Sequence, residues 1–182
     1  MYAHRPPVPV KRDPEATLRT IGIILYIVGM LIGGLLLLVY IFVPALMSKN
    51  AGAWMEAMLI GAVLALPAML VYVWIPWIVD RYDPEPLWAL LLVLGWGFVA
   101  ACGFSVLVNS EVSDFGEALG GKTFGDVLGA CVSAPLVEEG TKAMGVALMF
   151  FFFRRQFDGV VDGVIYATFA ALGFAACENI LY

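Results

Sequence analysis

Three ionisable side chains lie inside an apolar stretch that runs from about Phe124 to Phe153. They are Glu138, Glu139 and Lys142, within the octapeptide Pro-Leu-Val-Glu-Glu-Gly-Thr-Lys. A charged side chain at the centre of a bilayer costs about 2.5 to 3.5 kcal/mol, so such residues usually face a protein interior or a watered cavity with a function. We therefore treat the octapeptide as half of a candidate site.

The spacing of these three residues favours acid/base chemistry. On a helix at 100° per residue, Lys142 falls angularly between Glu138 and Glu139, so its ammonium group can pair with either carboxylate. If Lys142 pairs with only one of the two carboxylates, the two groups differ in how readily they bind a proton. One can then act as an acid and the other as a base. The spacing leaves open which glutamate is the base.

A second polar stripe occurs on the last apolar segment. Phe174, Glu178 and Tyr182 recur at i, i+4 and i+8, and Asn179 flanks them. Measured from the basic ends of their helices, Glu139 lies roughly 22 Å deep and Glu178 roughly 25 Å deep, at about 1.5 Å per residue. The two carboxylates are thus expected at similar depth on consecutive antiparallel helices.

Structural roles compete with this interpretation. A Glu-Lys pair alone is compatible with a structural brace, but four polar groups exceed what a brace needs. Asp162 is expected to cap the last helix rather than to act as a catalyst. The only histidine is His4 in the amino-terminal tail, which excludes a Cys-His nucleophile at Cys177 and a histidine-based metal site within these helices.

Composition identifies the elements that must position these groups. The chain has 182 residues, of which 62% are hydrophobic and 14% charged, far more apolar than a soluble domain. The sequence predicts an all-α, polytopic transmembrane bundle, with a tail at 1–16 and one domain at 17–182. About five spanning helices are predicted, at 18–47, 54–79, 87–109, 124–153 and 161–182.

Basic residues predict the orientation of these helices. With the amino terminus in the cytoplasm, seven of ten basic residues are cytoplasmic, two lie outside and Lys142 lies in the membrane. The cytoplasmic seven are Arg5, Lys11, Arg12, Arg19, Arg81, Arg154 and Arg155. In the first span, Gly29 and Gly33 form a Gly-x-x-x-Gly pair that allows a neighbouring helix to approach closely.

The combined motifs resemble the PrsW intramembrane proteases, within the superfamily of CAAX proteases and bacteriocin-processing proteins. They are Glu138-Glu139-x-x-Lys142, Asp162-Gly163-x-x-Tyr166 and Gly173-Phe174-Ala175-x-x-Glu178-Asn179-x-x-Tyr182, preceded by the turn at 80–86. The resemblance covers roughly 80–182.

The resemblance implies an endopeptidase of the bacterial cytoplasmic membrane that cleaves a single-pass membrane protein, such as an anti-sigma factor, near the outer face. By motif, Glu138 or Glu139 would be the general base, Glu178 would position the water or protonate the leaving amine, and Lys142 would tune the pair. No cofactor is predicted; carboxylates alone would bind a metal ion weakly.

The resemblance also sets expectations about partners and completeness. The protein's partners are the bilayer and the tethered substrate, while a net charge of −5 argues against nucleic acid. The family is expected to carry a later histidine motif, so the chain resembles an amino-terminal portion with weak activity of its own. The alternatives are a non-catalytic sensor or assembly protein on the same scaffold and a proton-coupled transporter.

Overall fold

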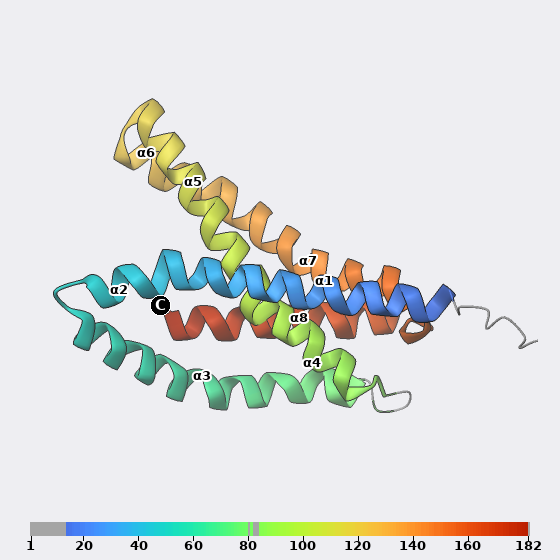
Figure 1. Cartoon of the computed structure of the whole chain (residues 1–182). Helices are drawn as coiled ribbons and strands as arrows, with labels where there is room; N and C mark the ends of the chain where they lie inside the picture. Colours follow the sequence, from blue (N-terminus) through green and yellow to red (C-terminus); the bar gives the residue numbers. More distant parts are fainter. Residues whose placement is uncertain (1–13, 80, 82–83, 182) are drawn as a thin grey trace, which may run out of the picture.

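The structure, a computed structural model, describes residues 14–79, 81 and 84–181, and this part of the chain is helical without any strand. Figure 1 shows long helical rods that pack obliquely, and a helical hairpin that projects from them. The elements are α1 (Pro14–Leu37), α2 (Val43–Met47), α3 (Ala51–Val79), α4 (Leu87–Gly95), α5 (Cys102–Gly120), α6 (Lys122–Leu128), α7 (Ala134–Phe152) and α8 (Val160–Leu181). Wider π-helical segments join them into continuous rods: η1 (Leu38–Phe42), η2 (Trp96–Ala101) and η3 (Gly129–Ser133); a 3-10 turn, η4 (Arg154–Gln156), follows α7.

Four of these rods are long and apolar enough to cross a membrane. They cover 15–47, 51–79, 87–120 and 160–181. A further long rod runs from α6 through α7 and is less apolar than these four, because it carries the charged side chains of Glu138, Glu139 and Lys142. The described residues thus confirm an all-α polytopic bundle of four to five spans.

Several predicted boundaries are wrong. The predicted loop between 109 and 124 is mostly helix, because α5 continues to Gly120 and α6 begins at Lys122. Gly121, with φ +82°, makes the turn between them, in a backbone conformation that favours glycine. A Cβ atom on Gly125 would lie 2.5 Å from the carbonyl oxygen of Ser113, so α5 and α6 pack in direct backbone contact.

The amino-terminal boundary also differs. The first helix begins at Pro14, so residues 14–16 of the predicted tail are helical, and residues 1–13 lie outside the described part. Proline fits this position because the first helical residues need no backbone N–H partner within the helix.

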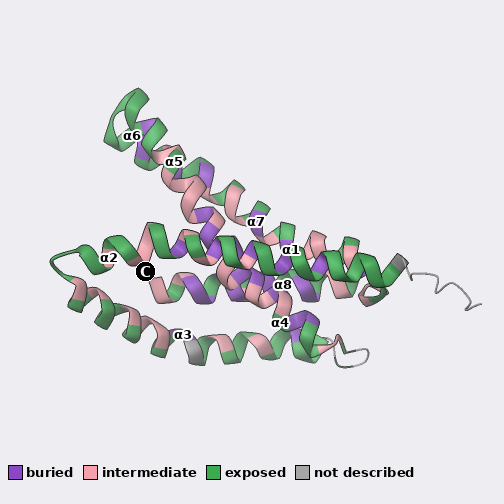
Figure 2. Ribbon diagram, in the orientation of Figure 1, coloured by how far each residue is buried: buried purple, intermediate pink, exposed green. Residues whose placement is uncertain are grey.

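The core lies where α1, η2 and α8 meet, and glycines bring these helices together. A Cβ atom on Gly97 would lie 2.0 Å from the carbonyl oxygen of Ala170, and one on Gly173 would lie 2.0 Å from that of Leu94. Figure 2 shows the buried residues concentrated at this crossing, while α3 is largely exposed.

The Gly29/Gly33 pair serves the same packing within the chain. A Cβ atom on Gly33 would lie 2.5 Å from the Cα atom of Ala100, and one on Gly29 would lie 2.4 Å from the Trp96 ring. The predicted close approach therefore occurs between α1 and η2.

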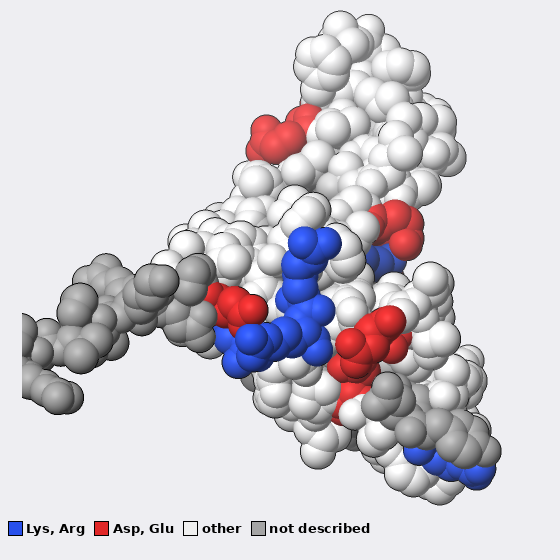
Figure 3. Space-filling view, turned by 90° about the vertical axis from the view of Figure 1, so that its right-hand side faces the viewer, with Lys and Arg blue, Asp and Glu red and all other residues white. Residues whose placement is uncertain are grey.

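The start of α1, the end of α3 and the turn between α7 and α8 lie at one end of the bundle (Figure 1). Figure 3 faces this end and shows basic and acidic side chains gathered on it. Arg155 in η4 forms an ion pair with Glu15 in α1. Asp162 caps α8 as predicted, because its carboxylate accepts hydrogen bonds from the backbone N–H groups of Asp158 (2.5 Å) and Gly159 (2.7 Å).

Candidate active site

Two buried aromatic side chains fix the rotation of α7. Trp96 Nε1 donates a hydrogen bond to the carbonyl oxygen of Thr141 at 2.9 Å. The Tyr26 hydroxyl donates one to the carbonyl oxygen of Gly145 at 2.5 Å. The Trp96 ring fits against Gly145, where a Cβ atom would lie 2.4 Å from it. These contacts from η2 and α1 hold one face of α7 in the core, so the direction of each side chain on α7 is set.

Thr141 connects this buried face to the glutamates. Its hydroxyl lies 3.0 Å from the hydroxyl of Ser105 on α5 and donates to the carbonyl oxygen of Glu138 at 3.0 Å. Both hydroxyl residues are buried. The turn of α7 that carries Glu138 is thereby tied to α5.

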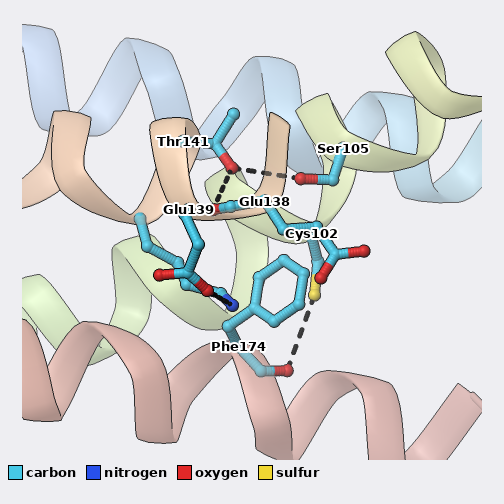
Figure 4. A network of polar contacts seen from close by, with 7 residues as sticks. Cys102, Ser105, Glu138, Glu139, Thr141 and Phe174 are labelled. Atoms are coloured by element: carbon cyan, nitrogen blue, oxygen red, sulfur yellow. Dashed lines mark hydrogen bonds and ion pairs between the residues drawn. The ribbon is translucent and has the colours of Figure 1, made fainter. Parts of the chain in front are cut away.

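Glu138 and Glu139 leave α7 on opposite sides of the Phe174 ring (Figure 4). The Glu139 carboxylate accepts a bond from Lys142 Nζ at 2.7 Å, and its side chain is 76% exposed. The same ammonium group lies 4.0 Å from the centroid of the Phe174 ring, a cation–π contact. Lys142 thus pairs with Glu139 and leaves Glu138 on the other side of the ring.

Glu138 and Glu178 line one half-buried cavity of about 150 Å³ between η1, α5, α7 and α8. The sequence placed Glu139 at the depth of Glu178; the structure places the neighbouring Glu138 in the cavity that Glu178 lines. The cavity is lined by Tyr40, Ile41, Cys102, Ser105, Val106, Asn109, Ser110, Glu138, Phe174, Glu178 and Leu181.

One of the predicted supporting residues lies away from the cavity. Asn179 borders a different groove, between α8 and α3, and donates its Nδ2 to the carbonyl oxygen of Ala175 at 2.8 Å. It does not line the cavity of Glu138 and Glu178, because adjacent residues on a helix point 100° apart. Tyr182 lies outside the described residues.

Sequence reasoning missed several polar residues of the cavity, all from other helices. Ser105 and Asn109 are spaced i, i+4 on an otherwise apolar span, a signal like that which drew attention to Phe174 and Glu178. Ser133 in η3 donates to Asn109 Oδ1 at 2.7 Å and orients the amide. At the rim, the Tyr40 hydroxyl donates to Glu111 at 3.0 Å.

Comparison with known proteins shows the family of this chain. The model of the family described as PrsW family intramembrane metalloprotease matches residues 85–182, which include α4 through α8 and both cavity glutamates. This chain belongs to the PrsW family. It is a multi-pass bacterial membrane protein, and no solved structure matches it.

Three curated relatives are each named Protease PrsW. The protein of Geobacillus kaustophilus is 33% identical over 103 residues, which are 57% of this chain and 43% of the relative. The protein of Bacillus subtilis is 31% identical over 103 residues, which are 57% of this chain and 44% of the relative. The protein of Clostridioides difficile is 45% identical over 51 residues, which are 28% of this chain and 21% of the relative. The chain therefore spans less than half the length of the curated relatives it matches.

The family's description as metalloproteases raises the question of metal ligands. A catalytic zinc ion takes three protein ligands and keeps one open position. Among the described residues, the cavity supplies the carboxylates of Glu138 and Glu178, and no group of three His, Cys, Asp or Glu side chains comes together to hold a metal ion. These described residues do not make a complete metal site.

Proposed function

We propose that this PrsW-family chain acts as an intramembrane endopeptidase in which Glu138 and Glu178 act on one water molecule. The observation that carries this proposal is the shared cavity, which carboxylates from two different helices line together with the buried residues Cys102 and Phe174. Such groups are expensive in a membrane and are usually functional.

The proposed chemistry is hydrolysis of a peptide bond. Glu138 accepts a proton from water as the water oxygen forms a bond to the peptide carbonyl carbon. The resulting tetrahedral intermediate collapses when its C–N bond breaks, and a carboxyl group returns the proton to the leaving amine. Glu178, which lines the same cavity, orients the water and shares the proton transfer.

Asn109 is suited to stabilise the negative charge that develops on the carbonyl oxygen. Ser133 holds Asn109 Oδ1, so the amide nitrogen presents its two N–H donors from the cavity wall. A preorganised donor aimed at an oxyanion typically contributes 100-fold or more to the rate. Glu139 and Lys142 act indirectly, as a pair that braces the exposed side of α7.

The position of the cavity bears on where the substrate is cleaved. Its lining includes Tyr40 in η1 and Leu181 at the end of α8, far along the bundle from the basic end. With the predicted orientation, that end faces outward. We therefore infer cleavage near the outer face, and the family resemblance implies a single-pass membrane protein, such as an anti-sigma factor, as the substrate.

Glu178→Gln tests the proposal, with Asn179→Ala as the matched control on the next residue. In proteoliposomes that hold the protein and a tethered single-pass substrate, we expect Glu178→Gln to slow cleavage about 100-fold or more, because a general acid/base is lost. Asn179→Ala should cleave at the wild-type rate. Wild-type cleavage by Glu178→Gln would remove this residue from the mechanism.

A further inference from the structure

A second cavity lies at the basic end of the bundle, away from the glutamates. It measures about 180 Å³ and lies between the start of α1 and the end of α7 with η4. Arginines and apolar side chains share its wall, among them Arg19, Arg154, Arg155, Leu18 and Phe151, with Glu15.

The packing of α1 against α7 forms this cavity. A Cβ atom on Gly22 would lie 2.6 Å from Phe152 Cβ and 2.7 Å from Phe153 Cε2, so glycine lets the two helices meet. Phe153 is buried, while Leu18 and Phe151, which line the same cavity, are exposed. The cavity therefore combines a buried aromatic side chain with exposed apolar ones, Leu18 and Phe151, which form its apolar flank.

The described residues that line the cavity carry a net positive charge. They include three arginines and one acidic residue, Glu15, which forms an ion pair with Arg155. The guanidinium group of Arg154 lies 5.4 Å from the centroid of the Phe150 ring, which holds this side chain over an aromatic face. Guanidinium groups bind phosphate with paired hydrogen bonds, and Arg19 and Arg154 present theirs beside the apolar flank.

We propose that this cavity binds the phosphate group of an anionic phospholipid, with the acyl chains along Leu18 and Phe151. The arginines lie where transmembrane helices begin and end, which is the headgroup level. Basic pockets between helices on the cytoplasmic side suit anionic headgroups, and the cytoplasmic leaflet attracts such clusters. The lipid would join the start of α1 to the turn between α7 and α8.

Lipid titration of the purified full chain in a zwitterionic detergent tests this site. Phosphatidylglycerol should raise the midpoint of thermal unfolding more than phosphatidylcholine does, because binding to the folded state stabilises it. The double variant Arg19→Gln/Arg154→Gln should bind phosphatidylglycerol about 25-fold more weakly, at about fivefold per arginine. Lys49→Gln/Lys122→Gln, which removes two charges outside the cavity, should bind as the wild type does.

Native mass spectrometry of the unmodified protein gives a second measurement that needs no variant. It should show phosphatidylglycerol retained in preference to phosphatidylcholine. Equal retention of the two lipids, or equal phosphatidylglycerol affinity in the wild type and the arginine double variant, would overturn the proposal. An equal thermal shift from inorganic phosphate at the same concentration would identify free phosphate as the ligand and overturn the lipid assignment.

Discussion

At the scale of single residues, the decisive feature is the different direction of two neighbouring glutamates. The sequence places Lys142 between Glu138 and Glu139 and gives no reason to prefer either. The choice depends on the rotation of α7, which hydrogen bonds from Trp96 and Tyr26 set. Those donors come from distant parts of the chain, so helical periodicity within 135–142 cannot reveal it.

The same limit explains why Asn179 was included and Asn109 missed. Asn179 adjoins Glu178 in the sequence, but a rotation of 100° turns it toward α3. The sequence predicts the helix of Asn109 only as an apolar span. The packing of α5 beside α7 brings Asn109 to the cavity, where Ser133 donates a hydrogen bond to its Oδ1.

Asn109→Ala tests this residue. We expect cleavage to slow about 100-fold with little change in the binding of substrate, because an oxyanion donor acts mainly in the transition state. The measurement is kcat and KM on a tethered substrate in proteoliposomes. An unchanged kcat would exclude Asn109 as the donor.

At the scale of helices, the site depends on how closely α8 approaches η2. Gly97 and Gly173 allow backbone contact there, which brings Glu178 toward the helices that carry Glu138 and Ser105. Small residues allow this approach because the driving force between helices in lipid is packing rather than the hydrophobic effect.

Gly173→Ala should therefore lower the free energy of unfolding by about 3 kcal/mol, since the added Cβ atom would meet the Leu94 carbonyl oxygen and overpack the contact. Gly140→Ala is the matched control, because its Cβ atom would meet nothing within 4 Å. The control should raise helix stability by about 0.5 to 1 kcal/mol. Thermal or denaturant unfolding in detergent measures both, and equal effects would contradict the packing argument.

Sequence patterns predicted the long apolar helices well, and they failed where a helix is polar. The rods at 51–79 and 160–181 lie within a few residues of the predicted spans. The extension of α5 to Gly120 was missed, because Glu111, Asp114 and Glu117 resemble a solvated loop. A helical hairpin that projects from the bundle tolerates such side chains, and the contact at Gly116 and Gly125 holds it together.

At the scale of the whole molecule, charge is distributed unevenly along the bundle. Arg19 in α1 and Arg154 and Arg155 in η4 belong to elements at one end, and Arg81 follows the end of α3 there, while Lys49 lies in the turn between α2 and α3 at the other end (Figure 1). By the positive-inside rule the basic end is cytoplasmic, and the glutamate cavity then lies toward the outer half of the membrane.

Cysteine labelling in cells tests this orientation. In a chain whose three cysteines are replaced by serine, Lys49→Cys should react with a membrane-impermeant maleimide added outside, and Arg155→Cys should react only after the membrane is opened. The reverse pattern would show the opposite orientation and would move the site to the cytoplasmic half.

The central claim is that Glu138, and not Glu139, works with Glu178 in one cavity. It is tested most directly by the cleavage rates of Glu138→Gln and Glu139→Gln, compared in the same proteoliposomes with the same tethered substrate. We predict that Glu138→Gln slows cleavage about 100-fold or more, because it removes the base. Glu139→Gln should slow it far less, because Glu139 pairs with Lys142 and does not line the cavity of Glu138 and Glu178. Loss of cleavage in Glu139→Gln together with a wild-type rate in Glu138→Gln would contradict the account.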